Sequence, residues 1–402
     1  MKPGRTPQLR RVERFDAIVV GARVAGASTA MLLARQGLRV VALERSREGS
    51  DALSTHALLR PGVVQLGRWG LLDEVAASGA PPVRRTVIHY GDEVAAIDIA
   101  ARHGVDAFYA PRRTVLDAIL ARAARAAGAE LRFGVPVTGL VRDDDGRVRG
   151  VEVRGAGGRR TEMHAPITIG ADGRRSLVAT AVGAPDDWRG AGAGGVVYAY
   201  FAGLEVDGYE WLYRPHVSAA LIPTNGGEVN VSATVPAARF AHDVRPDVER
   251  GFWRILAEAD REVAQRVAAA TRTSRWHSFA GQPGYHRRPF GPGWALVGDA
   301  GSFMDPTGAH GISSALRDAE LLARAIVRAH GGAVGEGEAL AAYRRSRDDL
   351  SARFFQAVDA VASYRWDLAS LRAELMAMSV EMGRESEALT LLDRPPALRP
   401  AA

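Results

Sequence analysis

Three short segments of the chain combine glycine with acidic or basic residues in patterns that suit nucleotide binding. The first, Gly21-Ala22-Arg23-Val24-Ala25-Gly26, separates an apolar strand-like run from a helix-like run. A dinucleotide fold needs glycine at this turn and small residues where the helix packs, and the helix N-terminus then receives the pyrophosphate. Glu44 ends the next strand-like run, where a carboxylate can accept hydrogen bonds from ribose hydroxyls. Arg23 stands where a second glycine is usual, and its guanidinium can pair with the pyrophosphate instead.

The other two segments each place an aspartate beside glycine at the end of a buried strand. Ile167 to Ile169 leads into Asp172-Gly173, and Trp294 to Val297 leads into Gly298-Asp299. The latter continues through Asp305-Pro306-Thr307-Gly308-Ala309-His310-Gly311-Ile312 into a helix, whose free N–H groups favour electron-rich oxygens. Each segment alone also fits an ordinary strand-to-helix turn, so the evidence lies in their combination.

The elements expected around these segments indicate an α/β fold. Strands over 15–20 and 38–43 flank a helix over 25–36, which is a β-α-β unit. From about residue 184 to 281 short alternating strands predict an antiparallel sheet, and from Ile312 onward the pattern is almost entirely helical. The sequence therefore predicts a Rossmann-like nucleotide-binding domain with an inserted antiparallel-sheet domain and a helical C-terminus.

Composition excludes several classes of function. The 402 residues are 47% hydrophobic and include no cysteine, which rules out disulfides, iron–sulfur clusters and a cysteine nucleophile; we expect no metal site. The net charge of +6 comes from arginines interleaved with acids, so we expect no nucleic-acid partner. Residues 1–14 lack the apolar core of a signal peptide, and no apolar run is long enough to span a membrane. We therefore expect a soluble, cytoplasmic protein, either a monomer or a homodimer.

Taken together, the three segments resemble the FAD-dependent aromatic hydroxylases, single-component flavoprotein monooxygenases of the para-hydroxybenzoate hydroxylase type. The resemblance covers about 15–183 and 285–328. It implies an FAD-binding domain over 12–183 and 284–330, to which 88–106 adds a part on the substrate side. It further implies a substrate-binding sheet over 184–283 and C-terminal helices over 331–394.

The resemblance also assigns cofactor contacts by position. It places the glycine turn and Arg60 at the pyrophosphate, Glu44 at the adenosine ribose, and Asp299 at a ribityl hydroxyl. The N–H groups of Gly311 and Ile312 would face the flavin pyrimidine edge. The full predicted set is Gly21, Arg23, Ala25, Gly26, Glu44, Arg45, Arg60, Arg113, Asp172, Asp299, Gly308, Gly311 and Ile312.

The implied reaction is hydroxylation or epoxidation of an aromatic or polyketide-like substrate. NAD(P)H, a transient co-substrate, would reduce FAD, and O₂ would then form a flavin C4a-hydroperoxide that transfers its distal oxygen. The candidate catalytic residues are His56, Tyr213, Pro306 and His310. Other roles remain open: His56 also fits a helix cap, His310 a loop histidine, and Tyr213 a packed aromatic of the sheet.

Two other functions stay open, and one is disfavoured. A reductase of isoprenoid double bonds, like the geranylgeranyl reductases, shares the fold and would need a long apolar tunnel. A protein that holds FAD while catalysing a non-redox cyclisation would consume no NAD(P)H. Flavin halogenases need a lysine near the flavin, whereas Lys2 is the only lysine in this sequence, and their Trp-x-Trp-x-Ile-Pro segment is missing.

Overall fold

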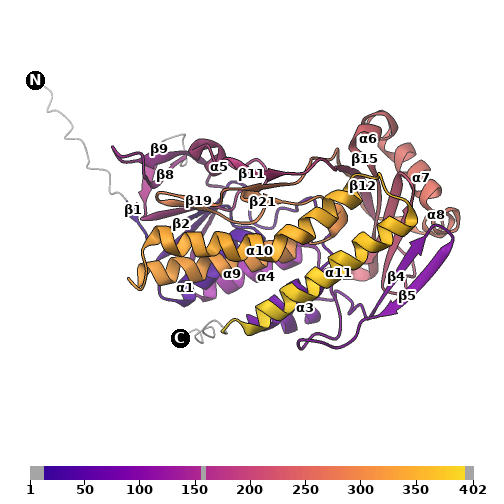
Figure 1. The fold of residues 1–402 in the computed structure, drawn as a ribbon, viewed down its shortest axis with the longest axis horizontal. Helices are drawn as coiled ribbons and strands as arrows, with labels where there is room; N and C mark the ends of the chain where they lie inside the picture. The colour runs from indigo at the N-terminus through magenta and orange to yellow at the C-terminus, as the bar shows by residue number, and fades with distance from the viewer. Residues whose placement is uncertain (1–12, 155–159, 394–402) are drawn as a thin grey trace, which may run out of the picture.

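A six-stranded sheet carries the first glycine segment at one end of the molecule (Figure 1). The computed structural model describes residues 13–154 and 160–393. Five of the six strands are parallel, and every residue of the central strands β2, β3 and β10 is buried, as expected for a sheet covered on both faces. In spatial order the strands are β19 (Phe290–Gly291), β20 (Trp294–Leu296), β10 (Ile167–Gly170), β2 (Ala17–Val20), β3 (Val40–Glu44) and β6 (Glu130–Phe133).

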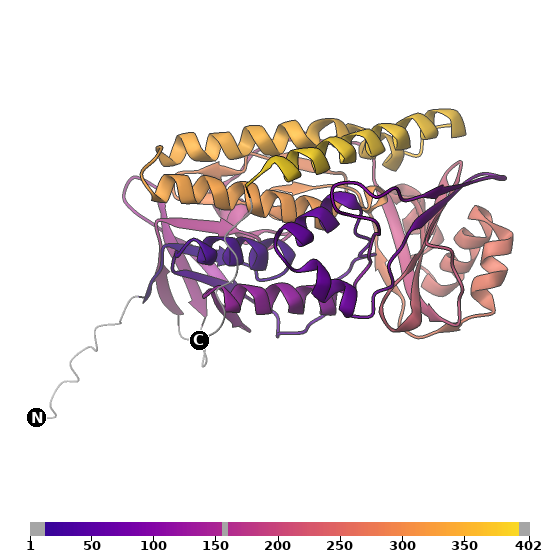
Figure 2. The same cartoon turned by 90° about the horizontal axis from the view of Figure 1, so that it is seen from below.

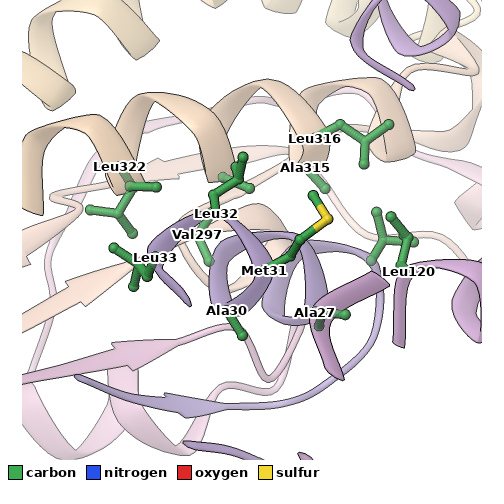
Figure 3. Packing of buried hydrophobic residues seen from close by; sticks show 14 of the residues in the cluster. Ala27, Ala30, Met31, Leu32, Leu33, Leu120, Val297, Ala315, Leu316 and Leu322 are labelled. Carbon is green, nitrogen blue, oxygen red and sulfur yellow. The ribbon is translucent and has the colours of Figure 1, made fainter. Parts of the chain in front are cut away.

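Helix α1 (Val24–Arg35) packs between this sheet, α4 (Arg113–Ala126) and α9 (Gly311–His330). Its apolar residues are small on one side and large on the other. Figure 3 shows Ala27 and Ala30 on α1, with Met31 lying towards Leu120 and Leu316. Small side chains let the helix approach its neighbours closely, and the large ones fill the remaining space.

An eight-stranded sheet forms the other end of the molecule. One face packs on α6 (Ala237–Asp243), α7 (Val248–Ala259) and α8 (Arg261–Ala268) through alternate valine, leucine and phenylalanine side chains. The other face turns towards the domain of the six-stranded sheet and towards the C-terminal helices. In order, its strands are β16 (Thr271–Arg272), β12 (Gly194–Ala202), β15 (Glu228–Pro236), β14 (Val217–Pro223), β13 (Tyr209–Arg214), β4 (Arg85–Tyr90) and β5 (Glu93–Asp98), with β17 (His277–Phe279) beside β12.

Smaller elements complete the two ends. A four-stranded sheet and a three-stranded sheet border the six-stranded sheet. The four-stranded sheet contains, in order, β1 (Glu13–Arg14), β9 (Arg160–His164), β8 (Val148–Arg154) and β7 (Val137–Arg142). The three-stranded sheet contains β11 (Asp186–Arg189), β18 (Tyr285–Arg287) and β21 (Ser302–Phe303). The remaining short helices are α2 (Arg60–Arg68), α3 (Leu72–Ala77), α5 (Leu177–Val182), η2 (Asn225–Gly227), η3 (Gly298–Ala300) and η4 (Pro306–Gly308).

Two long helices run along the molecule and join its ends. Helices α10 (Glu336–Ala362) and α11 (Leu368–Leu391) pack on each other and reach from the six-stranded sheet to the eight-stranded sheet (Figures 1 and 2). Within 13–154 and 160–393, no helix is both long and apolar enough to cross a bilayer. The segment 1–12, which the sequence predicted not to be a signal peptide, lies outside the described residues.

The predicted fold class is confirmed, because an α/β nucleotide-type domain, an inserted antiparallel sheet and C-terminal helices are all present. Strands β4 and β5 join the second sheet through the parallel pairing of β4 with β13. On these pairings we propose the division into a cofactor domain over 12–183 and 284–330, a sheet domain over 184–283 that 88–106 extends, and C-terminal helices over 331–394.

A buried carboxylate ties three helices together. Glu320 of α9 is 1% exposed, and its two oxygens accept from four side chains: Arg68 Nη2 (2.8 Å), Arg324 (2.8 Å), Gln65 Nε2 (2.5 Å) and Trp69 Nε1 (2.9 Å). Arg68 also donates to three carbonyl oxygens at the end of α11 and just after it. The carboxylate therefore joins α2 to α9 directly, and Arg68 extends the connection to α11.

We predict that Glu320→Ala lowers the free energy of unfolding by about 3 kcal/mol, because the buried Arg68 loses its carboxylate partner, and Gln65 and Trp69 lose the acceptor of their N–H groups. Urea titration at pH 7 measures the effect. The matched control is Glu338→Ala on the exposed face of α10, which we expect to change stability by less than about 0.5 kcal/mol. Equal values for the two variants would contradict the assignment.

Candidate functional site

The turn between β2 and α1 leaves no space for side chains. Gly21 adopts a φ of +101°, and a Cβ there would lie 2.4 Å from the carbonyl oxygen of Ala171. A Cβ on Gly26 would lie 1.9 Å from the carbonyl oxygen of Gly21. Glycine is therefore required at both positions. Helix α1 has no side-chain cap and no acidic residue in its first turn, so its N-terminal N–H groups remain available to an anion.

Two arginines converge on one carboxylate beside this turn. Arg113 makes a bidentate pair with Asp117 (3.0 and 3.1 Å), and Arg23 Nη1 lies 3.9 Å from the same carboxylate. Arg23 Nη2 donates to the carbonyl oxygen of Asp51, whereas its Nη1 is buried without a hydrogen-bond partner. One carboxylate offsets one of the two positive charges, so the excess charge and the unpartnered donor fit a pyrophosphate.

Glu44 closes the other side of the turn. Its two carboxylate oxygens accept from the backbone N–H groups of Ala22 (3.2 Å) and Ser46 (2.9 Å), which fixes the side chain at the end of β3. The next residue, Arg45, is exposed. A carboxylate held here has lone pairs left over, which suits the ribose contact that the sequence predicts for Glu44.

The two predicted aspartates follow β10 and β20. Asp172 Oδ2 accepts from the N–H of Leu177 (2.6 Å) at the start of α5, and its Oδ1 is buried without a partner. Asp299 lies in η3, and burial raises the pKa of its carboxyl to about 6, although Arg174 and Arg113 lower it. A carboxylate kept in this destabilising place without a tight ion pair is typical of a binding site.

Helix α9 begins beside the turn between β2 and α1; we call the region between the glycine turn 21–26, Asp299 and Gly311 the cofactor groove. Its N-cap His310 makes no side-chain cap bond, the first backbone bond of the helix is Ser314 N–H to His310 O, and a Cβ on Gly311 would meet no atom within 4 Å. A Cβ at Gly298 would lie 2.8 Å from the Cβ of Ala25 and 3.6 Å from that of Ala315, so η3, α1 and α9 meet here. The N–H groups of the first turn therefore stay open to a ligand in this groove.

Three predicted residues point elsewhere. The imidazole of His310 turns into the protein and bonds to Glu385, rather than to the groove. The guanidinium of Arg60 donates to three carbonyl oxygens, those of Ala100, Arg102 and Val105, so it anchors a loop in this structure. Tyr213 packs 6.4 Å from Trp366 in an apolar cluster with α10 and α11.

Two further predicted residues, Pro306 and Gly308, lie in the turn before α9. Pro306 begins η4, where it is partly buried, and Asp305 caps this turn through the N–H of Thr307 (2.9 Å). A Cβ on Gly308 would lie 2.7 Å from Val358 of α10, so the turn sits tightly on that helix. Their role in this structure is to aim the start of α9.

His56 lies between the cofactor groove and the eight-stranded sheet. It is 2% exposed, has a φ of +45°, and stacks on Tyr200 at 5.6 Å. Neither ring nitrogen has a hydrogen-bond partner. Burial, with the nearby Arg113 and Arg112, lowers the pKa of His56 to about 3, so the ring is neutral at physiological pH. A strained, buried and unpartnered imidazole is a candidate ligand contact.

The sequence analysis did not single out the sheet residues around His56. Tyr198 accepts a hydrogen bond from Ser54 N–H (3.1 Å) and stacks on His277 at 4.9 Å, and the guanidinium of Arg112 lies 3.7 Å from the centroid of Tyr200. Asn230, directly opposite Tyr200 in the sheet, is fully buried, and both of its amide atoms lack partners. Alternation along β12 puts both tyrosines on one face, but their partners come from other segments of the chain.

Fold and site together define a flavoprotein-type nucleotide-binding protein, and comparison with known proteins identifies the family. The model of the FAD binding domain family matches residues 14–358. The chain therefore belongs to this family, and FAD is its cofactor, as predicted. The family match, together with hydroxylases among the relatives, also confirms the predicted class of flavoprotein oxidoreductase.

Relatives of known name include aklavinone hydroxylases, proteins named FixC and a reductase. Aklavinone 12-hydroxylase RdmE of Streptomyces purpurascens is 35% identical over 42% of this chain and 34% of its own length. Digeranylgeranylglycerophospholipid reductase of Methanosarcina mazei is 26% identical over 79% and 76%. The matched part of the chain spans about a third to two fifths of the first curated relatives, so reaction and substrate remain matters of proposal.

Solved structures confirm the fold. The flavin-dependent brominase Bmp2 superposes with a TM-score of 0.78 at 19% identity, covering 92% of this chain and 94% of its own. PqsL of Pseudomonas aeruginosa, in complex with 2-aminobenzoylacetate, gives 0.76 at 22% identity, with 90% and 100% coverage. At such identities the likeness concerns the fold alone.

We predict that Asp299→Asn stabilises the cofactor-free protein in a pH-dependent way. The folded-state pKa of about 6 lies above the value of about 3.9 in an unfolded chain. The stabilisation by the protonated carboxyl is therefore fully present below about pH 4 and lost as the pH rises through 6. The variant should gain about 2 kcal/mol at pH 8 and almost nothing near pH 4 in urea titrations.

The matched control is Asp305→Asn. Asp305 is also buried, but its carboxylate accepts from Gly194 N–H (2.7 Å), Thr307 N–H and Thr307 Oγ1 (2.6 Å). An amide nitrogen cannot accept these bonds, so this variant should be less stable at both pH values. A loss of stability in Asp299→Asn at pH 8 would refute the site assignment.

Proposed function

We propose that this protein is an FAD-dependent, NAD(P)H-using monooxygenase that hydroxylates or epoxidises an aromatic or polyketide-like molecule. The observation that carries the proposal is the aromatic face of the eight-stranded sheet, which contains buried polar atoms without partners and lies against the start of α9. Leu59, Trp211 and Ala309 are partly buried and pack against the cluster of Tyr209 and Ala220, so this face of the sheet is apolar. An apolar surface with a few unpartnered polar groups suits a flat, oxygenated aromatic ligand.

By this proposal, separate groups of residues bind the cofactor, position the substrate and exclude water. Bound FAD supplies the redox chemistry and the activation of O₂. Arg23 and the N-terminus of α1 bind the phosphates, Glu44 holds the adenosine ribose, and Asp299 binds a hydroxyl of the ribityl chain, which joins the phosphates to the flavin ring. Neutral His56 is too weak a base to take a proton at pH 7, so it positions a substrate oxygen by hydrogen bonding. The sheet and α10 exclude water from the space between them.

The relatives support an aromatic substrate. RdmE and DnrF of Streptomyces peucetius both bear the name aklavinone 12-hydroxylase, and DnrF is 27% identical over 75% of this chain and 65% of its own length. By the proposal, an aromatic polycycle would lie between Trp211 and Ala309, with its oxygens towards His56 and Asn230.

A second candidate is reduction of isoprenoid double bonds. The relative named digeranylgeranylglycerophospholipid reductase favours it, because the match covers more of both chains than that of RdmE. The polar atoms of His56 and Asn230 argue against it, because a hydrocarbon would leave them buried without partners.

The test first measures the FAD content and NAD(P)H oxidation, and then the incorporation of oxygen into the product. Purified protein is expected to hold FAD in near one-to-one ratio and to oxidise NADH or NADPH faster when an aromatic polycycle is added under air. Incorporation of one ¹⁸O atom from ¹⁸O₂ into the product would establish monooxygenation. Anaerobic saturation of an isoprenoid would establish the reductase instead, and product formation without NAD(P)H consumption would establish a cyclase.

We predict that Asn230→Leu separates stability from function. Leucine has a similar shape and removes two unpartnered polar atoms, so the free energy of unfolding should be unchanged or higher by up to about 1 kcal/mol. The KM for an oxygenated aromatic substrate should rise about tenfold, because a bond to substrate oxygen is lost, while the affinity for FAD stays constant. A destabilised variant with an unchanged KM would contradict the assignment.

A further inference from the structure

The loop between β3 and α2 passes from the cofactor groove to the aromatic face of the eight-stranded sheet. Near its start, the carbonyl oxygen of Asp51 accepts a hydrogen bond from Arg23 Nη2 (3.2 Å). Near its end, the N–H of Leu58 donates to the carbonyl oxygen of Tyr109 (2.9 Å). His56 lies between these two contacts, so the course of the loop decides where its imidazole stands.

Tyr198 of β12 holds the middle of this loop from the side of the sheet. Its hydroxyl accepts from Ser54 N–H (3.1 Å), and Ser54 Oγ in turn accepts from His56 N–H (3.0 Å). The Tyr198 ring is buried, stacks on His277 at 4.9 Å and meets Tyr200 edge-on at 6.1 Å. Because this packing fixes the ring, its hydroxyl is a fixed acceptor for the loop.

The backbone at His56 needs such a restraint. Its φ of +45° lies in the left-handed region, which is unfavourable for a residue that carries a side chain. A strained residue keeps this conformation only where the surrounding contacts outweigh the strain. One such contact is the stack of its ring on Tyr200, and another is the bond from its N–H to Ser54 Oγ. The second contact depends on Ser54, which Tyr198 holds in place.

In this conformation both ring nitrogens of His56 are buried and have no hydrogen-bond partner. A neutral imidazole offers one N–H donor and one acceptor nitrogen, so this ring suits a hydroxyl or a carbonyl oxygen of a ligand. A loop released at Ser54 would relax the left-handed backbone, and the ring would then leave its place on Tyr200.

We propose that Tyr198 is a positioning residue for substrate binding: its hydroxyl holds the loop at Ser54, and the loop in turn holds the imidazole of His56 in place for a bond to a substrate oxygen. The inference rests on the proposed function, because it takes His56 as a contact to an oxygenated aromatic substrate. Tyr198 acts through Ser54 and His56 and needs no contact with the substrate itself.

The first experiment measures the loop without any substrate. Tyr198→Phe removes the hydroxyl and keeps the ring, so it isolates the bond to the loop. Hydrogen exchange of the FAD-loaded protein, measured by mass spectrometry on peptides that contain 51–56, should be about tenfold faster in this variant, because Ser54 N–H loses its acceptor. The matched control is Tyr343→Phe, which removes another buried hydroxyl, one that donates to the carbonyl oxygen of Leu296 (2.9 Å). It should leave the exchange of the loop unchanged.

The second experiment measures the affinity of the FAD-loaded protein for alizarin, a dihydroxylated anthraquinone, by visible absorbance. Tyr198→Phe and His56→Phe should each weaken binding about tenfold while the FAD content stays constant, because a bond to a ligand oxygen is lost. The double variant should resemble His56→Phe, since Tyr198 acts through His56. Tyr343→Phe should bind alizarin as the wild type does. If Tyr198→Phe proves unstable in urea, Ser54→Ala interrupts the same chain at its next bond and should weaken alizarin binding equally.

The outcomes separate this inference from the proposed function. Exchange at the wild-type rate in Tyr198→Phe would overturn the inference, because the hydroxyl would then not hold the loop. Wild-type affinity for alizarin in Tyr198→Phe, together with weak binding in His56→Phe, would overturn it as well, since the loop would not govern the imidazole. A wild-type protein that binds no alizarin, or a His56→Phe variant that binds it equally well, would instead refute the substrate contact of the proposed function.

Discussion

The close approach of the backbone at Gly21 to the end of β10 is the constraint on which the site depends. No side chain fits there, because the carbonyl oxygen of Ala171 would lie 2.4 Å from a Cβ. This contact brings the N-terminus of α1 beside the turn of Asp172. A second close approach, at Gly298, brings η3 and the start of α9 to the same place. Two glycines thus assemble one groove from segments far apart in the chain.

Contacts along helix α9 fix its position beside the cofactor groove. At its middle, Glu320 joins α2 and α11 with all of its neighbouring donors paired. At its start, His310 joins α11 again through Glu385. Arg68 carries the first of these connections to α11, and Glu385 lies on α11, so the C-terminal helix, which packs on α2 and α10, also fixes the position of α9 (Figure 2).

Some buried polar groups are fully paired, and others lack a partner. Glu320 and Asp305 have their oxygens occupied by donors, as expected where a charge only holds elements together. Arg23 Nη1, both nitrogens of His56 and the amide of Asn230 are buried and unpartnered. These unpartnered groups lie along the groove and on the sheet face beside it, where a cofactor and a substrate would complete their hydrogen bonds.

The sequence by itself determined the β-α-β unit, the two aspartate turns and the FAD-binding class, because these depend on local backbone geometry. The turn at Gly21 and the start of α9 near Gly311 could be predicted from residues that are neighbours in the sequence. The sequence also predicted that Arg23 contacts the pyrophosphate, and in the structure Arg23 lies near Asp117, with which Arg113 also pairs.

Only the tertiary structure decided where the long side chains point. His310 is next to the groove in sequence, yet its ring turns to Glu385, 75 residues away. Arg60 begins the expected helix, yet its guanidinium finds the carbonyls of a loop. The sheet face of Tyr200 and Asn230 exists only once separate strands pair. Side-chain direction follows from the packing of distant elements, which local patterns of glycine and charge do not encode.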